Sequence, residues 1–105
     1  MNHLPTSQLF SLEGKPVICT GGTGGIGQAL CKTLAEAGAD IVSIQIPNDP
    51  HAESLSKCVA EIGRKLWTFD CNLADPSSLR STFRDIWNAG ITPSVLLNCA
   101  GLLAL

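Results

Sequence analysis

The sequence predicts an α/β fold built on a doubly wound parallel sheet, and three observations support this prediction. Short apolar segments alternate along the chain with segments whose apolar residues recur at helical spacing. Glycines crowd the junction between the first apolar segment and the first helical one, in "TGGTGGIG". Polar residues follow the third and fourth apolar segments, in "FDCNL" and "NCAG". Alternation of strand and helix is typical of parallel sheets with helical crossovers.

The first half of the chain contains two predicted strand–helix pairs. The run "VIC" predicts a buried strand at 17–19, and "DIVSIQI" predicts a second strand at 40–46. Helical spacing predicts a helix over 26–37 that stops at Gly38, and a second helix that stops at Gly63. The expected buried face of the first helix consists of Ile26, Ala29, Leu30, Leu34 and Ala37, and that of the second of Leu55, Val59 and Ile62.

The second half repeats the alternation. "KLWTF" predicts a third strand, and "SVLLNCA" predicts a fourth. Between them, Asp75 has the character of a helix N-cap and Pro76 that of a first helical residue. We expect residues 1–105 to form a single domain. The expected buried face of the third helix consists of Leu79, Phe83 and either Ile86 or Trp87.

Composition and charge narrow the classes of partner. Of the 105 residues, 45% are hydrophobic and 15% are charged, which is typical of a globular protein with an apolar core. The formal net charge of −2 provides no basic surface for nucleic acid or an anionic membrane. The N-terminal "MNHLPTSQLF" lacks the features of a signal peptide, and no apolar stretch reaches the roughly 20 residues of a membrane span. We therefore expect a cytoplasmic protein that binds neither nucleic acid nor membrane.

The five cysteines are scattered without a CxxC pair, and several lie in apolar segments. This pattern favours reduced thiols in the core over a disulfide framework or a metal site. The cysteines are Cys19, Cys31, Cys58, Cys71 and Cys99.

The glycine cluster indicates a phosphate-binding loop. A helix N-terminus presents free N–H groups, and a phosphate bound there must approach the backbone closely. Three patterns fit: GxGxxG at Gly22, Gly24 and Gly27; GxxGxxG at Gly21, Gly24 and Gly27; and TGxxxGxG at Gly21, Gly25 and Gly27. No GK[ST] follows, which disfavours a nucleotide triphosphatase. The alternative is a glycine-rich turn that only allows the helix to pack closely on the strand.

Three motifs together resemble the short-chain dehydrogenase/reductase family. "TGGTGGIG" is similar to its TGxxxGIG, "DCNL" to its D-x-[ND]-[LV], and "NCAG" to its NNAG, all at strand ends where ligands bind. The resemblance covers residues 9–102. It implies a Rossmann-like sheet of order 3-2-1-4, truncated here after the fourth strand, in a partial dinucleotide-binding domain.

The resemblance also implies a set of cofactor-binding residues. The glycines would lie under the pyrophosphate, and Ile26 would anchor the start of the helix. The Asp70 carboxylate would accept a hydrogen bond from the adenine amino group, and Asn98 would tie neighbouring strands near the ribose. Cys99 departs from the family, which usually has a second asparagine there. The implied set is Thr20, Gly21, Thr23, Gly25, Ile26, Gly27, Gln45, Asp70, Leu73, Asn98, Ala100 and Gly101.

In the fold that the resemblance implies, the residue at the end of the second strand selects between NAD and NADP. In this fold an acid at that point binds the 2′-hydroxyl group of NAD, whereas an arginine binds the 2′-phosphate group of NADP. Gln45 occupies the position and is neither, while Asp49 follows within reach. No lysine or arginine occurs between Lys32 and Lys57, which favours NAD.

The family implies hydride transfer between NAD(P) and an alcohol or carbonyl substrate, with a serine and a Tyr-x-x-x-Lys pair in catalysis. The chain has no tyrosine, and we expect it to be inactive alone. Its exposed fourth strand also predicts self-association. Two alternatives stay open: a non-catalytic nucleotide-binding remnant, and a Rossmann-like methyltransferase.

Overall fold

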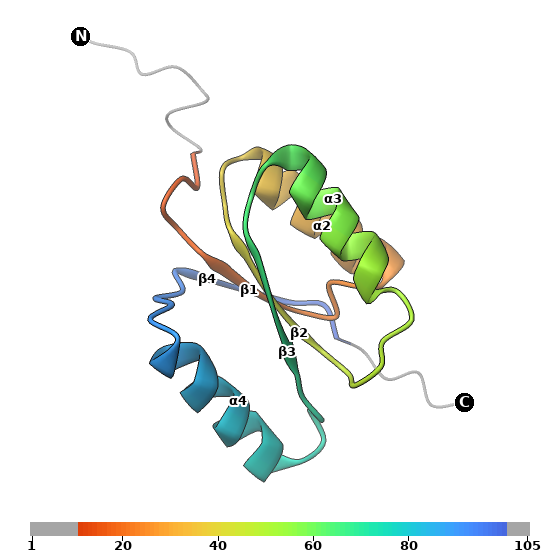
Figure 1. The fold of residues 1–105 in the computed structure, drawn as a ribbon, viewed down its shortest axis with the longest axis vertical. Coiled ribbons are helices and arrows are strands. Elements are labelled where there is room, and N and C mark those ends of the chain that lie inside the picture. Colours follow the sequence, from red (N-terminus) through yellow and green to blue (C-terminus); the bar gives the residue numbers. More distant parts are fainter. Residues whose placement is uncertain (1–10, 101–105) are drawn as a thin grey trace, which may run out of the picture.

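The computed structural model describes residues 11–100, in which strands and helices alternate along the chain. All strand pairs are parallel, and the sheet order is β3-β2-β1-β4, as expected. Helices α2 and α3 cover one face of the sheet, and α4 covers the other (Figure 1). The elements are β1 (Val17–Thr20), α2 (Gly25–Glu36), β2 (Ile41–Gln45), α3 (Ala52–Ile62), β3 (Leu66–Asp70), α4 (Pro76–Asn88) and β4 (Val95–Asn98).

The predicted helix ends are confirmed by backbone geometry. Gly63 ends α3 in the left-handed conformation, with φ of 85°, which glycine adopts without strain. The Asp75 side chain caps α4 by accepting a hydrogen bond from the Ser77 N–H at 3.0 Å, and Pro76 is the first residue of that helix. Local sequence therefore determines where these helices begin and end.

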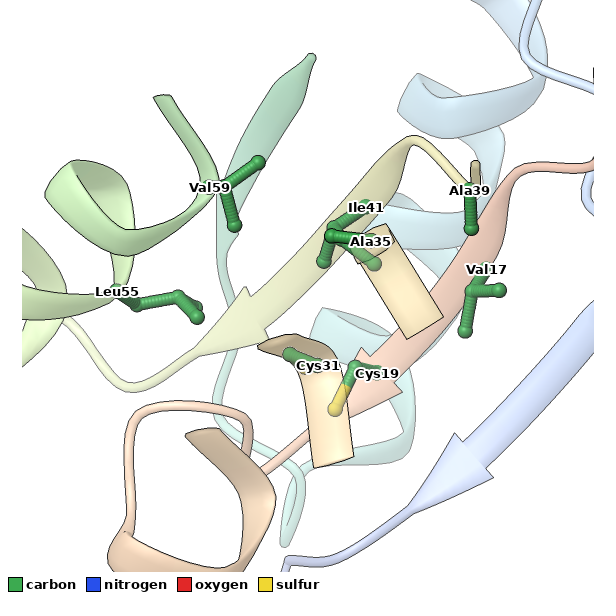
Figure 2. Packing of buried hydrophobic residues seen from close by; sticks show 8 residues of the cluster. All are labelled: Val17, Cys19, Cys31, Ala35, Ala39, Ile41, Leu55 and Val59. Atoms are coloured by element: carbon green, nitrogen blue, oxygen red, sulfur yellow. The ribbon is translucent and has the colours of Figure 1, made fainter. Parts of the chain in front are cut away.

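A core of buried residues lies between the sheet and the pair of helices α2 and α3. Figure 2 shows side chains of β1 and β2 gathered with side chains of α2 and α3 in this core. Two of the expected cysteines are here, since Cys19 and Cys31 are fully buried. The cluster consists of Val17, Cys19, Cys31, Ala35, Ala39, Ile41, Leu55 and Val59.

The predicted buried face of α2 is correct only for Leu34, which packs against the core. Ile26 is 80% exposed, so it does not anchor the start of the helix on the sheet, and Leu30 is also exposed. The helix instead turns a stripe of small side chains inward, because small residues let its backbone approach β1 closely. That stripe consists of Gly27, Cys31 and Ala35, with Leu34 partly buried beside it.

The predicted face of α4 is correct only in part. Ile86 is buried and Leu79 packs beside the second core cluster, as expected. Thr82 is buried as well, and its hydroxyl is satisfied by donating a hydrogen bond to the Ser78 carbonyl at 2.9 Å. Phe83 and Trp87 remain exposed, so the expectation that Phe83 is buried is wrong.

None of the helices found within residues 11–100 has the length and apolar character needed to cross a membrane.

Candidate dinucleotide-binding site

A cavity of about 620 Å³ opens at the carboxyl ends of the parallel strands. Its walls come from four segments that are distant in sequence: the glycine-rich loop after β1, the end of β2 with the loop that follows, the segment after β3 and the segment after β4. This volume lies in the range of small-molecule and cofactor pockets, and strand ends are where doubly wound sheets bind ligands.

Two glycines of the loop are required by packing. Gly21 has φ of 71°, and a Cβ atom there would lie 2.5 Å from the Ala100 amide nitrogen. A Cβ atom on Gly27 would collide with the Gly21 carbonyl oxygen. These glycines therefore hold the loop, the first turn of α2 and the segment after β4 against one another, whatever the cavity contains.

Two other glycines are not required by packing. A Cβ atom on Gly25 would meet nothing within 4 Å, and one on Gly24 would meet the Gly21 carbonyl oxygen at an ordinary 3.6 Å. Gly24 lines the cavity and is the N-cap of α2, and it provides no side-chain cap for the first turn. The space beside this helix N-terminus is open, and the dipole of α2 makes it favourable for an anion.

A carboxylate in the cavity wall is bonded to the glycine-rich loop. The Asp49 Oδ2 atom accepts a hydrogen bond from the Thr23 hydroxyl at 2.7 Å, and its Oδ1 atom accepts one from the His51 N–H at 2.9 Å. Both Thr23 and Asp49 line the cavity, and Gln45 lies beside them. The Gln45 side chain in turn accepts a hydrogen bond from the Ser43 hydroxyl at 3.3 Å. Asp49 thus joins the glycine loop to the loop after β2.

Asn98 ties two neighbouring strands, as expected. Its Oδ1 atom accepts a hydrogen bond from the Thr20 hydroxyl at 2.6 Å, and the two residues are partners in the β1–β4 register. The backbone continues this contact, because the Cys99 N–H donates to the Thr20 carbonyl at 2.9 Å. The segment carrying Cys99 and Ala100 is therefore held against the glycine loop.

After β3, the cavity is lined by Asn72, Leu73 and Ala74, and Asp70 is not among its lining residues. Asp70 is the exposed last residue of β3, paired in register with Gln45. Asn72 forms a turn in which its Oδ1 atom accepts a hydrogen bond from the Ala74 N–H at 3.1 Å. The adenine contact of Asp70 stays a prediction, and Asn72 is the polar side chain that this segment adds to the wall.

The structure brings together only part of the predicted set. Thr20 and Asn98 do not line the cavity and bond to each other, while Gly25, Ile26 and Gly27 belong to the start of α2. Gly101 lies outside the described residues. The predicted set did not include Gly24, Asn72 and Ala74, although Gly24 and Asn72 lie within its motifs and Ala74 directly follows one. The predicted residues that line the cavity are Gly21, Thr23, Gln45, Leu73 and Ala100.

Comparison with known proteins agrees with this architecture. The chain resembles a short-chain type dehydrogenase/reductase from Mycobacterium marinum in fold, with a TM-score of 0.84 and 24% identity over 96% of this chain and 40% of that one. It also resembles NAD+-bound xylitol dehydrogenase, with a TM-score of 0.80 and 26% identity over 87% of this chain and 35% of that one.

Sequence relatives and a family model give the same assignment. The chain is 35% identical over 98 residues to 2-dehydro-3-deoxy-D-gluconate 5-dehydrogenase of Bacillus subtilis, which covers 90% of this chain and 36% of that enzyme. It is 38% identical over 88 residues to a sorbose reductase of Candida albicans, covering 80% of this chain and 30% of that enzyme. The chain thus spans about a third of the length of these relatives. The model of the short chain dehydrogenase family matches residues 15–105, and the chain belongs to this family of oxidoreductases.

Proposed function

We propose that this chain is the dinucleotide-binding part of an NAD(P)-dependent oxidoreductase that acts on an alcohol or carbonyl substrate. The observation that carries the proposal is the open space at Gly24 and Gly25. Packing explains Gly21 and Gly27, but it leaves these two glycines without a structural reason. A pyrophosphate that approaches the backbone at the start of α2 supplies the reason.

The described residues fit such a cofactor. The open helix N-terminus would hold the pyrophosphate, and the wall of Gln45, Asp49 and Asn72 would face the adenosine side. When bound, the nicotinamide supplies or accepts a hydride. The chain's own residues bind and orient the dinucleotide and exclude water from one side of it.

Replacing Gly25 with valine tests the proposal. The side chain would fill the open space, so we expect NADH binding to fall at least tenfold, measured by calorimetry, while the free energy of unfolding changes by no more than about 0.5 kcal/mol. Ala29→Val is the matched control, because Ala29 is exposed one turn further along α2 and does not line the cavity. Unchanged NADH affinity in a folded Gly25→Val protein would refute the phosphate site.

We further propose that the cofactor is NAD rather than NADP. The cavity wall carries the Asp49 carboxylate, and no lysine or arginine is among its lining residues. A carboxylate repels the 2′-phosphate group of NADP and can accept a hydrogen bond from the 2′-hydroxyl group of NAD. We expect NADH to bind at least tenfold more tightly than NADPH, and Asp49→Asn to narrow the difference. Tighter binding of NADPH to the unmodified chain would contradict this assignment.

We propose finally that the 105 residues bind cofactor without turnover. The family resemblance calls for a tyrosine as general acid/base, and the chain has none. A positioned acid/base group contributes about 10²–10⁴-fold to rate. Absorbance of NADH, followed with a panel of sugars, keto acids and ketones, should stay constant. Reproducible oxidation above the Gly25→Val background would show that another group supplies the proton.

A further inference from the structure

One wall of the cavity is a short turn between the end of β3 and the start of α4. Asn72, Leu73 and Ala74 form it, and all three line the cavity. The Asn72 Oδ1 atom accepts a hydrogen bond from the Ala74 N–H, and the Asn72 carbonyl accepts one from the Asp75 N–H at 3.0 Å. These two bonds close the turn on itself, but they do not fix its position relative to the helix that follows.

A side chain outside the cavity ties this turn to the helix. Ser78 lies in the first turn of α4, and its Oγ atom accepts a hydrogen bond from the Asn72 N–H at 3.0 Å. The same hydroxyl donates to the Cys71 Sγ atom at 3.6 Å. Ser78 does not line the cavity, and it belongs to none of the motifs from which the site was predicted. It nevertheless bonds directly to the backbone of a residue that does line the cavity.

Ser78 is itself fixed by the core. Its carbonyl accepts a hydrogen bond from the hydroxyl of Thr82, which is buried. Cys71, the acceptor of the Ser78 hydroxyl, is 2% exposed and belongs to the core cluster that contains Ile86. A side chain held on both sides in this way can place a backbone N–H accurately, because its own position is set by its neighbours.

We propose that Ser78 is a positioning residue for the adenosine side of the cofactor. It holds the turn of Asn72, Leu73 and Ala74 where that turn forms a wall of the cavity, and it acts through the Asn72 backbone without touching the ligand. The identity of the ligand rests on the proposed function, whereas the positioning of the turn rests on the hydrogen bonds alone.

Loss of the Ser78 hydroxyl would leave the Asn72 N–H to water. The turn would stay closed by its own bonds and could move as a unit relative to α4. A bound adenosine would then have to order the turn, and this entropy would be lost from the affinity. The glycine-rich loop is held by other contacts, to Asp49 and to the Ala100 backbone, so we expect the pyrophosphate site to be unaffected.

The test compares Ser78→Ala with the unmodified chain, using two probes that differ only in adenosine. ADP carries adenosine on a pyrophosphate group, and inorganic pyrophosphate lacks it. We expect Ser78→Ala to weaken ADP binding about three- to tenfold, the range given by one ordinary hydrogen bond, and to leave pyrophosphate binding unchanged, both measured by calorimetry. Ser78→Thr keeps the hydroxyl and should bind ADP as the unmodified chain does.

Two results would overturn the proposal. An equal loss of affinity for both probes in Ser78→Ala would indicate general damage to the domain. Unchanged affinity for ADP would show that the hydroxyl does not position the adenosine wall.

Ser77 provides the matched control. It is the neighbouring serine in α4, it is exposed, and it does not line the cavity. Ser77→Ala removes a hydroxyl from the same helical turn and should change neither ADP nor pyrophosphate affinity. A loss of ADP affinity as large as that in Ser78→Ala would assign the effect to the helix rather than to the bond with Asn72, and it would also overturn the proposal.

Hydrogen exchange of the Asn72 amide, followed by NMR in the ligand-free chain, separates this inference from the proposed function. We expect exchange to be at least about threefold faster in Ser78→Ala than in the unmodified chain or Ser77→Ala. Faster exchange in a chain that binds neither ADP nor NADH would refute the proposed function and leave Ser78 as the residue that positions the turn. Unchanged exchange would refute the positioning role, even in a chain that binds NADH.

Discussion

Strands β2 and β4 both pair with β1 in parallel, yet their surroundings differ sharply. Four of the five β2 residues are buried, with Ile41 and Val42 completely enclosed. In β4, Leu96 is 64% exposed and Val95 is 36% exposed. β2 lies between β1 and β3, whereas β4 forms an edge of the sheet within residues 11–100.

The comparison shows that hydrogen bonding to a neighbour does not bury a strand. Burial of β2 needs a strand on each side and side-chain layers on both faces, where the two core clusters lie. β4 has a strand on one side, and only Leu97 packs against a cluster of buried residues. Two apolar strands that flank β1 therefore differ in burial: β2 is part of the core, and β4 forms an apolar edge.

The largest effect is expected on the enclosed side. Ile41→Ala removes a side chain that is 0% exposed, and we expect it to reduce the free energy of unfolding by about 2–5 kcal/mol. Urea unfolding followed by circular dichroism measures the change. A loss below about 1 kcal/mol would show that β2 is packed no more tightly than the exposed strand β4.

Within β4 itself, the two neighbouring leucines should behave differently. Leu97 packs against the cluster around Cys19, and Leu97→Ala should cost about 2 kcal/mol of unfolding free energy. Leu96 points to the other face and is exposed, so Leu96→Ala should cost less than about 1 kcal/mol. Equal costs, measured in the same urea titrations, would argue that the edge is covered in solution.

The open edge also predicts self-association. An exposed apolar edge strand can pair with another copy of the chain, and a charge on it opposes such pairing. We expect Leu96→Lys to lower the mean molecular mass at high concentration, measured by light scattering. Ser94→Lys adds the same charge at an exposed position without removing an apolar side chain, so it should lower the mean mass less. A monomeric unmodified chain at high concentration would contradict the prediction.

The smallest effect is expected at Trp87 on α4. Trp87 is 72% exposed, so Trp87→Ala should change the free energy of unfolding by no more than about 0.5 kcal/mol. The adjacent Ile86 is 2% exposed, and Ile86→Ala should cost about 2–5 kcal/mol. Thermal unfolding of the two variants gives the contrast directly, and similar melting temperatures would refute the assignment of the buried face.

Local sequence patterns predicted the order of elements and the caps at Gly63 and Asp75, whereas the sheet order was implied by the family resemblance. The expected face of α3 is confirmed, whereas those of α2 and α4 were predicted only in part. The inward stripe of α2 includes Gly27, Cys31 and Ala35, whose small side chains give a weak hydrophobic pattern beside the bulkier Ile26 and Leu30. Size at a close helix–sheet contact outweighed hydrophobicity there.

The site was predictable where a motif fixes the backbone and less so where a turn directs a side chain. The glycine loop and the Thr20–Asn98 contact follow from strand-end motifs. The position of Asn72 in the wall depends on the turn after β3, and the Thr23–Asp49 bond depends on how two distant loops meet. Neither has a local pattern from which it could be derived.

The bond between Thr23 and Asp49 has a consequence for how a ligand would be chosen. Both carboxylate oxygens of Asp49 already accept a hydrogen bond from the protein. A ribose hydroxyl that approaches Asp49 must share these oxygens, so its net gain is modest, on the order of 0.5–1.5 kcal/mol. The negative charge, by contrast, acts on a phosphate whether or not the oxygens are occupied. Selection at this wall would then come from excluding the wrong nucleotide more than from attracting the right one.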